Sequence, residues 1–279
     1  MSELKTIQQL EDEVGRPNTT LSLAHELKRL GLQPGQTVLV HSALSKLGWV
    51  CGGPVAVILA LEEALTQTGT LILPTHSTDL SDPARWQHPP VPDSWWEPIR
   101  RNLPPFQPDL TPTRNMGIIA ETFRKQASVL RSWHPAHSFA AWGQHAEQVI
   151  EGHALEYSFG EESPLARLYA LEGWVLLLGV DHGNNTSLHL AESRADFASK
   201  KFITAGAPLR VQTPAGLVEQ RWVQYTDLDY DESDFETLGA AFEQTGAVKI
   251  GKVGLATCRL MPQQALVDFG IEWLEKNRR

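Results

Sequence analysis

Trp174-Val175-Leu176-Leu177-Leu178-Gly179-Val180 is a continuous apolar run, and the polar segment Asp181–Thr186 and the segment Ser187–Glu192 follow it. A short apolar run bounded by turn residues is typical of a strand buried on both faces, as in a parallel sheet. The residues after it predict a loop and then a helix, for which Thr186 or Ser187 can be the cap. We therefore expect an α/β protein with a site where the loop leaves the carboxyl end of this strand.

The predicted helix carries a histidine and a carboxylate at helical spacing, His189 and Glu192. Residues three apart share one face of a helix, so Glu192 can hold one ring nitrogen of His189. Asp181, at the end of the strand, is the other carboxylate that can do so. The free nitrogen can then take a proton, which is the arrangement of an oriented general base. On spacing alone, a capped helix with a satisfied histidine explains the pattern equally well.

The composition bounds the class of protein. The 279 residues, 42% of them hydrophobic, are enough for one domain with a full core. No apolar run reaches the roughly 18 residues of a membrane span, and the first residues do not form a signal-peptide pattern. The two cysteines, Cys51 and Cys258, fit neither a disulfide framework nor a zinc site. We therefore expect a cytoplasmic protein.

The charge bounds the class of partner. A net charge of −9 argues against nucleic-acid binding, which needs a basic face. The same charge suits a cationic small molecule, which the field of the protein would attract. Solubility alone also explains it. We expect a small-molecule partner, no nucleic acid and no membrane, and a monomer or homodimer.

A glycine-containing loop follows the first predicted strand, Thr37–Ser42, and ends at Gly52-Gly53. Pro54 is a good first residue for the helix that comes next. Backbone N–H groups at such a helix start can bind phosphate. The loop is neither the dinucleotide fingerprint nor the Walker loop, so an ordinary strand–loop–helix crossover explains it as well.

The segment at about 79–112 is long and rich in proline and tryptophan. Loops of this length inside a domain are usually functional or disordered, and the aromatic residues favour an ordered flap over a site. Asp79 and Glu97 are among its acidic groups and could bind a cation. His134 and His137 lie three apart in a later loop without a third metal ligand at matching spacing. We expect them to anchor the backbone or bind substrate, and we predict no metal.

The remaining segments fit one α/β domain covering residues 1–279. Helices are predicted from about Met116, at 146–150, from near Pro164, after Glu192 to about Ala198, and at 235–244 and 262–276. A hairpin around a Pro-Ala-Gly turn is predicted at 209–225, and a strand at 248–260. Repeats and linkers are not visible. We expect a central mixed sheet flanked by helices, with the β-hairpin in the C-terminal third.

Six short motifs occur in an order that resembles the aminoglycoside 3-N-acetyltransferase family, the antibiotic N-acetyltransferases. They are His41-Ser42-Ala43-Leu44-Ser45, Gly52-Gly53-Pro54, Leu73-Pro74-Thr75-His76-Ser77, Thr113-Arg114-Asn115-Met116-Gly117, His134-Pro135-Ala136-His137-Ser138 and Asn185-Thr186-Ser187-Leu188-His189-Leu190-Ala191-Glu192. Each motif alone is weak, but their joint order over about 30 to 275 is specific. The resemblance implies a fold unlike that of GCN5-type acetyltransferases.

The resemblance also implies an activity. It is acetyl transfer from acetyl-coenzyme A to the 3-amino group of a 2-deoxystreptamine aminoglycoside, by direct attack in a ternary complex, which causes antibiotic resistance. His189 would be the base, with Glu192 or Asp181 orienting it, and the hydroxyl of Thr186 or a backbone N–H would stabilise the oxyanion.

The family motifs also place the two ligands. Coenzyme A would contact His41, Ser42, Leu44, Ser45, Gly48, Val50, Gly52, Gly53, Thr75, Ser77, Arg114 and Met116. The drug would contact Asp79, Trp96, Glu97, His134 and His137. Ala43 stands where the family often has a second serine, so any coenzyme contact from that hydroxyl is lost.

Four other interpretations stay open at this point. The first is a cysteine acyltransferase with Cys51, in a glycine-rich loop, as nucleophile. The second is a metal hydrolase, although the pair His189 and Glu192 lacks the second histidine of the two-histidine zinc helix. The third is a coenzyme A-binding module without turnover. The fourth is a member of the same family that acetylates an amine other than an antibiotic.

Overall fold

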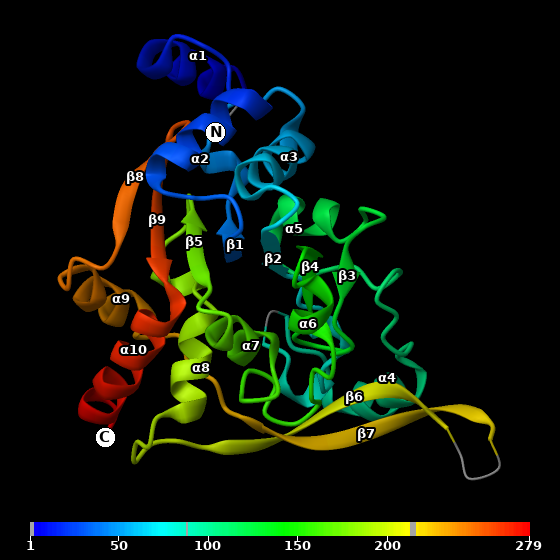
Figure 1. The fold of residues 1–279 in the computed structure, drawn as a ribbon. Helices are drawn as coiled ribbons and strands as arrows, with labels where there is room; N and C mark the ends of the chain where they lie inside the picture. Colours follow the sequence, from blue (N-terminus) through cyan, green and yellow to red (C-terminus); the bar gives the residue numbers. More distant parts are fainter. Residues whose placement is uncertain (1–2, 88, 213–215) are drawn as a thin grey trace.

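The centre of the computed structural model, which describes residues 3–87, 89–212 and 216–279, is a seven-stranded mixed sheet (Figure 1). Its strand order is β3-β4-β2-β1-β5-β9-β8. The strands are β1 (Thr37–Ser42), β2 (Thr70–Pro74), β3 (Leu130–Arg131), β4 (Phe139–Gly143), β5 (Trp174–Leu178), β8 (Lys249–Val253) and β9 (Ala256–Pro262). β1 is parallel to β2 and to β5, so these three strands end at the same edge of the sheet.

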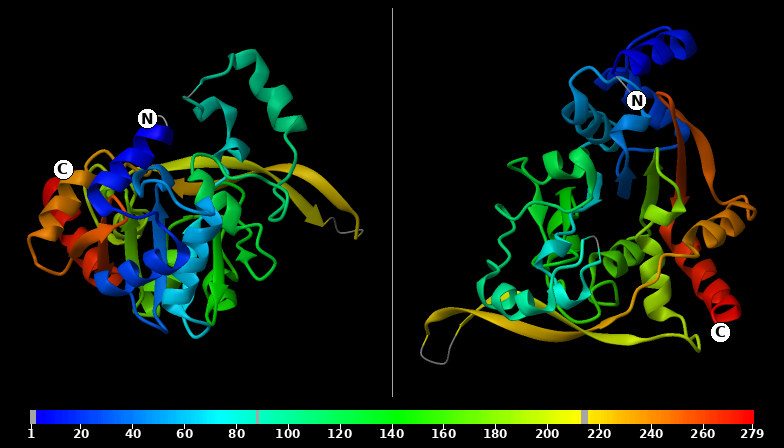
Figure 2. Two further views of the ribbon diagram at one scale, coloured as in Figure 1. Left: turned by 90° about the horizontal axis from the view of Figure 1, so that it is seen from above. Right: turned by 180° about the vertical axis from the view of Figure 1, so that it is seen from behind.

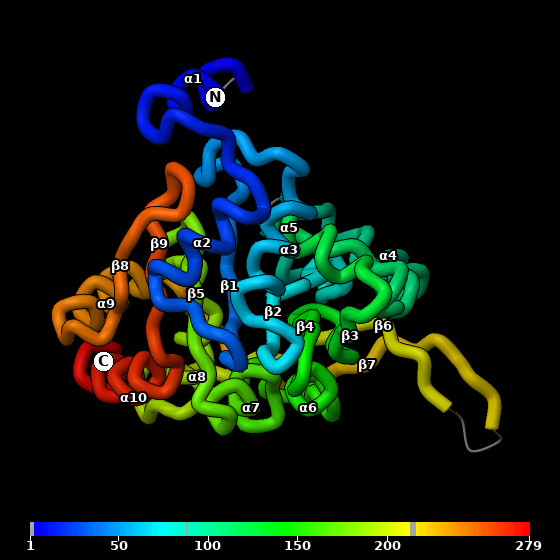
Figure 3. Tube along the Cα trace, turned by 45° about the horizontal axis from the view of Figure 1, so that its top comes forward, coloured from blue at the N-terminus to red at the C-terminus, as the bar shows by residue number. Residues whose placement is uncertain are grey.

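Side chains alternate between the two faces of the central strands, and each face has its own apolar core. On β1, Val38 and Val40 pack with helices on one face, while Leu39 packs on the other. The first face is covered by α2 (Thr20–Leu30), α3 (Gly53–Leu65) and α5 (Gly117–Phe123), as Figure 3 shows for α2 and α3. The second face is covered by α6 (Ala146–Ile150), α7 (Pro164–Ala170), α8 (Ser187–Arg194), α9 (Phe235–Glu243) and α10 (Gln263–Asn277).

The predicted fold class, with its mixed sheet, is confirmed, and two elements differ from their predicted bounds. β5 is buried as expected, and it pairs parallel with β1 and antiparallel with β9. α8 ends at Arg194 instead of near 198. The predicted strand at 248–260 is two strands joined at Gly254, whose φ of 54° favours glycine.

The predicted hairpin is longer than expected and forms a separate two-stranded ribbon of β6 (Phe202–Gln212) and β7 (Val218–Leu228). Figure 2 shows this ribbon, in yellow, extending past the sheet. The predicted Pro-Ala-Gly turn falls mainly on 213–215, which lie outside the described residues.

The Pro/Trp-rich segment is ordered, and its helix α4 (Trp96–Asn102) packs beside β7 (Figure 1). Arg100 joins its parts, because the guanidinium binds Asp82 at 2.7 Å and Glu97 at 2.9 Å. The Gln220 side chain of β7 donates to the carbonyl of Leu103 at 2.7 Å. These contacts tie the segment to the hairpin.

Helix α1 (Glu3–Val14) lies apart from the sheet, where Trp49 Nε1 donates to the Glu3 carboxylate at 3.1 Å (Figure 1). No helix among the described residues is long and apolar enough to cross a membrane.

Candidate active site

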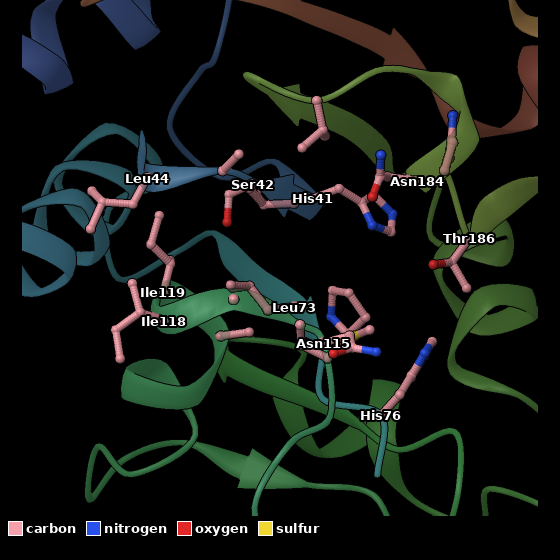
Figure 4. A pocket seen from close by; sticks show the side chains of 18 of the residues that line it. His41, Ser42, Leu44, Leu73, His76, Asn115, Ile118, Ile119, Asn184 and Thr186 are labelled. Atoms are coloured by element: carbon pink, nitrogen blue, oxygen red, sulfur yellow. The ribbon is translucent and has the colours of Figure 1, made fainter. Parts of the chain in front are cut away.

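A cavity of about 1230 Å³ opens where β1, β2 and β5 end, as predicted from the strand–loop–helix pattern. Its walls include the loop after β1, the loop after β2, the start of α5 with the residues before it, the loop and helix after β5, and the segment before α9. Figure 4 shows His41, His76 and Thr186 converging on it from three of these elements. The cavity is larger than a typical single-ligand pocket, so it has room for two substrates.

His189 and Glu192 form a direct pair on the first turns of α8. His189 Nδ1 lies 2.5 Å from Glu192 Oε2, and the Glu192 side chain is only 1% exposed. Because a carboxylate can only accept, Nδ1 carries the proton and Nε2 is left as an acceptor at the cavity. Glu192 Oε1 accepts from the Arg278 guanidinium and from the backbone N–H of Asp231. Glu192 is therefore a buried, fully paired carboxylate and not a solvent-exposed side chain on a helix surface.

Aromatic side chains fix the orientation of the His189 ring. Phe159 stacks on it with ring centroids 4.9 Å apart, and Tyr230 and Phe235 lie at 5.0 and 4.9 Å. All three rings also line the cavity. The imidazole is thus held by one carboxylate and three rings, which is how a catalytic group is kept in one geometry.

His41 and His76 enter the cavity from the ends of β1 and β2, and Figure 4 shows both rings directed into it. They are 5% and 8% exposed, and Nε2 of each has no hydrogen-bond partner among the described residues. Burial, and next the nearby His189, lower the pKa of His41 to about 3; the same two causes, in that order, hold the pKa of His76 well below its usual value. A buried polar atom without a partner is costly, so these neutral imidazoles suit contacts with a bound molecule.

Of the two carboxylates that could orient His189, Glu192 makes the contact and Asp181 does not. Asp181 is 66% exposed, pairs with Arg259 at 3.0 Å and is not part of the cavity wall. Thr186 does line the cavity, and it does not cap α8 through its side chain. Its hydroxyl points into the cavity (Figure 4) and is therefore available to a ligand.

Most of the predicted coenzyme residues line the cavity: His41, Ser42, Leu44, Ser45, Gly48, Val50, Gly53 and Met116. Four do not. Thr75 and Ser77 are buried and bind the 135–138 loop, since Thr75 Oγ1 lies 3.2 Å from Ser138 Oγ and Ser77 donates to the Pro135 carbonyl at 2.7 Å. Arg114 pairs with Asp79 at 3.3 Å, and Gly52 is the cap of α3.

Among the predicted drug-binding residues, only His137 lies in the cavity wall. His134 is fully buried: its Nδ1 accepts from the N–H groups of Ala136 and His137, so its Nε2–H donates to Leu155. It anchors the backbone, the alternative left open for it. The remaining three, Asp79, Trp96 and Glu97, belong to the Pro/Trp-rich segment and do not line the wall; α4, which carries Trp96 and Glu97, packs beside β7.

Acidic groups reach the cavity from a segment that sequence reasoning gave no role. Asp231 and Glu232, before α9, line the wall. Hydrogen bonds from Ser233, and then the charge of Arg278, hold the pKa of Asp231 below its usual value, so it stays ionised. The acidic composition of 226–234 was the visible signal. Asn115, with a φ of 59°, also lines the wall; it lies in the fourth family motif but was not among the predicted contact residues.

Two alternatives find no support in the site. Cys51 is exposed outside the cavity wall, and its N–H is used by the Asn18 carbonyl. Within the described residues, no cluster of three or more histidine, cysteine, aspartate or glutamate side chains is arranged to hold a metal ion.

Comparisons with known proteins agree with the motifs. A family model described as "Aminoglycoside 3-N-acetyltransferase" matches residues 39–275. The "SPbeta prophage-derived aminoglycoside N(3')-acetyltransferase-like protein YokD" of Bacillus subtilis (strain 168) is 46% identical over 262 residues, 94% of each chain. The solved structure "AAC-IIIb binary with CoASH" is 33% identical with a TM-score of 0.82, over 94% of this chain and 98% of the other.

A second solved structure, "AAC-VIa bound to Sisomicin", is 29% identical with a TM-score of 0.82, covering 94% of this chain and 99% of that one. The matches span nearly the whole chain, and the family model covers far more than half of it. The resemblance drawn from the six motifs is confirmed: this chain belongs to the aminoglycoside 3-N-acetyltransferase family.

Proposed function

We propose that the protein moves the acetyl group of acetyl-coenzyme A to the 3-amino group of a 2-deoxystreptamine aminoglycoside by direct attack, and so gives resistance to the antibiotic. The observation that carries this proposal is the His189–Glu192 pair at the edge of a cavity large enough for both substrates. The relative solved with coenzyme A and the one solved with sisomicin support the two substrate classes.

His189 acts on the amine. An alkylammonium cannot attack a thioester until it loses a proton, and the Nε2 atom of His189 is free to take it. The resulting imidazolium is stabilised by Glu192, which holds Nδ1–H at 2.5 Å. As the amine nitrogen bonds to the acetyl carbon, the hydroxyl of Thr186 donates to the oxygen on which negative charge develops. The carbon–sulfur bond then breaks, and coenzyme A leaves as a thiol with the proton that His189 carried, while the remaining ammonium proton passes to solvent. Asp181 has no part in this scheme, because it pairs with Arg259.

The loop after β1 holds the coenzyme in this proposal. Ser42 and Ser45 offer hydroxyls, and the backbone at Gly53 faces open space, since a Cβ there would meet nothing within 4 Å. The start of the thirteen-residue helix α3 adds N–H groups suited to phosphate. Coenzyme A supplies the acetyl group as a thioester.

The acidic wall holds the drug. Asp231 and Glu232 line the same cavity as His189 and can pair with the other ammonium groups of an aminoglycoside. His137 is the further contact from the predicted set. We also propose that residues 1–279 act as one domain, and that the segment at about 79–112 is a flap at its rim.

The test is thiol release from acetyl-coenzyme A across a panel of aminoglycosides and simple amines. We expect turnover with drugs that carry a free 3-amino group and none with the same drugs acetylated there. Turnover with simple amines and with none of the aminoglycosides would show that the substrate is an amine other than the antibiotic. Coenzyme binding without turnover on any amine would contradict the enzymatic proposal.

Mass spectrometry separates direct attack from the cysteine mechanism. Mixing the protein with acetyl-coenzyme A alone should leave its mass unchanged, and Cys51→Ala should keep its turnover. A stoichiometric acetyl adduct on Cys51 would overturn direct attack.

A further inference from the structure

Arg278, just after α10, reaches the pair that forms the base. Its side chain is 8% exposed, and one nitrogen of the guanidinium donates to Glu192 Oε1. Another donates to the Asp231 carbonyl at 2.5 Å, and Asp234 takes the rest of the fork at 2.5 and 2.8 Å. Glu192 and Arg278 are 86 residues apart in sequence.

Glu192 needs this partner because its carboxylate is almost fully buried. Removing a carboxylate from water is costly unless charge and hydrogen bonds replace the lost solvent. Oε2 is used by His189, and Oε1 by Arg278 and the N–H of Asp231. Arg278 is the positive charge in contact with this carboxylate, and its planar fork fixes where Oε1 lies.

The same guanidinium also holds the acidic wall. It binds the carbonyl of Asp231 and the carboxylate of Asp234, on either side of Glu232 in the chain. Asp231 and Glu232 line the cavity. The charged plane further lies 5.9 Å from the ring centroid of Phe235, which touches the His189 ring. One side chain thus connects the base with the wall expected to bind the amine.

We propose that Arg278 is a positioning residue for the acetyl transfer: it holds Glu192 against His189 and holds the Asp231–Glu232 wall at the cavity. This inference rests on the proposed function. It predicts that Arg278 affects both kcat and the KM for the amine, while the KM for acetyl-coenzyme A, whose residues lie on the loop after β1, stays unchanged.

The kinetic test uses Arg278→Met and Arg278→Lys. We expect Arg278→Met to lower kcat by about 10- to 100-fold, less than the roughly 10²–10⁴-fold for loss of a general base, and to raise the KM for the amine. Arg278→Lys keeps the charge without the fork, so it should recover part of both. If Arg278→Met does not fold, the double variant Arg278→Met/Asp234→Asn takes its place, because it also removes the negative charge of Asp234 that Arg278 neutralises.

Two arginines serve as controls. Arg194, on α8 beside Glu192 in the chain, makes a similar forked pair with Glu161 at 2.7 and 2.9 Å but touches neither Glu192 nor the wall. Arg194→Met should therefore lower stability, but it should not raise the KM for the amine relative to the KM for acetyl-coenzyme A. Arg279→Ala removes an exposed neighbouring arginine and should behave as the parent protein.

The pH profile separates positioning from a purely structural role. The groups facing the pair are Arg278, Asp231, Asp234, Tyr230 and Lys200, together with the imidazoles of His41, His76 and His137. Without the positive charge of Arg278, the Glu192 carboxylate acts on His189 uncompensated and favours its protonated form. The acidic limb of kcat/KM should move to higher pH in Arg278→Met and return in Arg278→Lys.

Nuclear magnetic resonance of the His189 ring gives the same readout without turnover. The titration midpoint of this ring, assigned by its loss in His189→Gln, should rise in Arg278→Met. A midpoint that stays or falls, with kinetics matching those of Arg194→Met, would overturn the inference. If the midpoint rises in Arg278→Met but the parent protein acetylates no amine, the connection of Arg278 to His189 through Glu192 is supported and only the proposed function is refuted.

Discussion

Three imidazoles lie beside Phe159, and two of them, His137 and His189, are connected to a buried carboxylate in different ways. His189 stacks on the phenyl ring at 4.9 Å and binds Glu192 directly. His137 lies at 4.6 Å from the same ring; its Nδ1 is 3.9 Å from Asp227 Oδ2, and hydrogen bonds connect the two through Ser158. Both rings line the cavity, so they differ mainly in how the carboxylate is connected to each ring.

The hydroxyl of Ser158 fixes the proton on His137 without stabilising a charge. Ser158 donates to Asp227 at 2.8 Å, so it must accept the Nδ1–H of His137 at 2.7 Å. Burial, and then the neighbouring His76 and His189, hold the pKa of His137 well below its usual value. His137 is therefore a neutral acceptor, whereas the carboxylate that contacts His189 directly can stabilise this ring when it takes a second proton.

The largest effect expected from this difference is on turnover. His189→Ala should lower kcat by about 10²–10⁴-fold, since the base is lost. Glu192→Gln should lower it less, because the amide oxygen can still accept the hydrogen bond but cannot stabilise the imidazolium by charge. Steady-state kinetics with a coenzyme titration for each variant measure this. Near-normal kcat in His189→Ala would move the base to His76 or His137.

The free energy of unfolding should fall as the pH is lowered, because five imidazoles in and near the cavity stay neutral in the folded protein. The pKa values of His41 and His134 lie at about 3, mainly through burial, and burial also lowers those of His76, His137 and His153. Below a pH of about 6.5 only the unfolded chain binds protons at these rings. The free energy of unfolding therefore falls by about 1.4 kcal/mol for each histidine and each pH unit.

The loss should begin near pH 6.5 and continue towards pH 3. Urea unfolding between pH 7.5 and 5 measures it, and His153→Gln should reduce the slope. A free energy of unfolding that stays flat over this range would contradict neutral burial.

The smallest effect concerns the indirect support of His137. Ser158→Ala removes the link to Asp227 and should raise the KM for the amine by up to about 10-fold with kcat nearly unchanged, as for one lost hydrogen bond. Ser132→Ala is the matched control, because Ser132 binds His153 at 3.0 Å outside the cavity wall. A large drop in kcat for Ser158→Ala would erase the distinction between the two imidazoles.

Local patterns in the sequence were enough for the centre of the fold and for the contact between His189 and Glu192. The run Trp174–Val180 predicted a buried strand, and the spacing of His189 and Glu192 predicted their contact. Both follow from periodicity within one or two elements. The loop after β1 was predicted as a wall of the site for the same reason, since it leaves the carboxyl end of a strand.

Partners that are distant in the chain could not be predicted from such patterns. Asp227 is 69 residues from Ser158, and Arg278 is 86 from Glu192, so only the tertiary fold brings them together. The acids of the Pro/Trp-rich segment also have partners that were not predicted: Glu97 pairs with Arg100 and Asp79 with Arg114. The neighbouring arginines were visible, but their geometry was not.

The ribbon of β6 and β7 should tolerate insertions and deletions unequally along its length. Asp227 lies at its root, where it is paired with Ile203 in register, while Gln212 and Val218 are the last described pair towards the far end. Changes of length at that end leave the root in place. A single residue lost from β7 near Val223 would instead shift the register by one, turning Asp227 to the opposite face of the ribbon and away from Ser158.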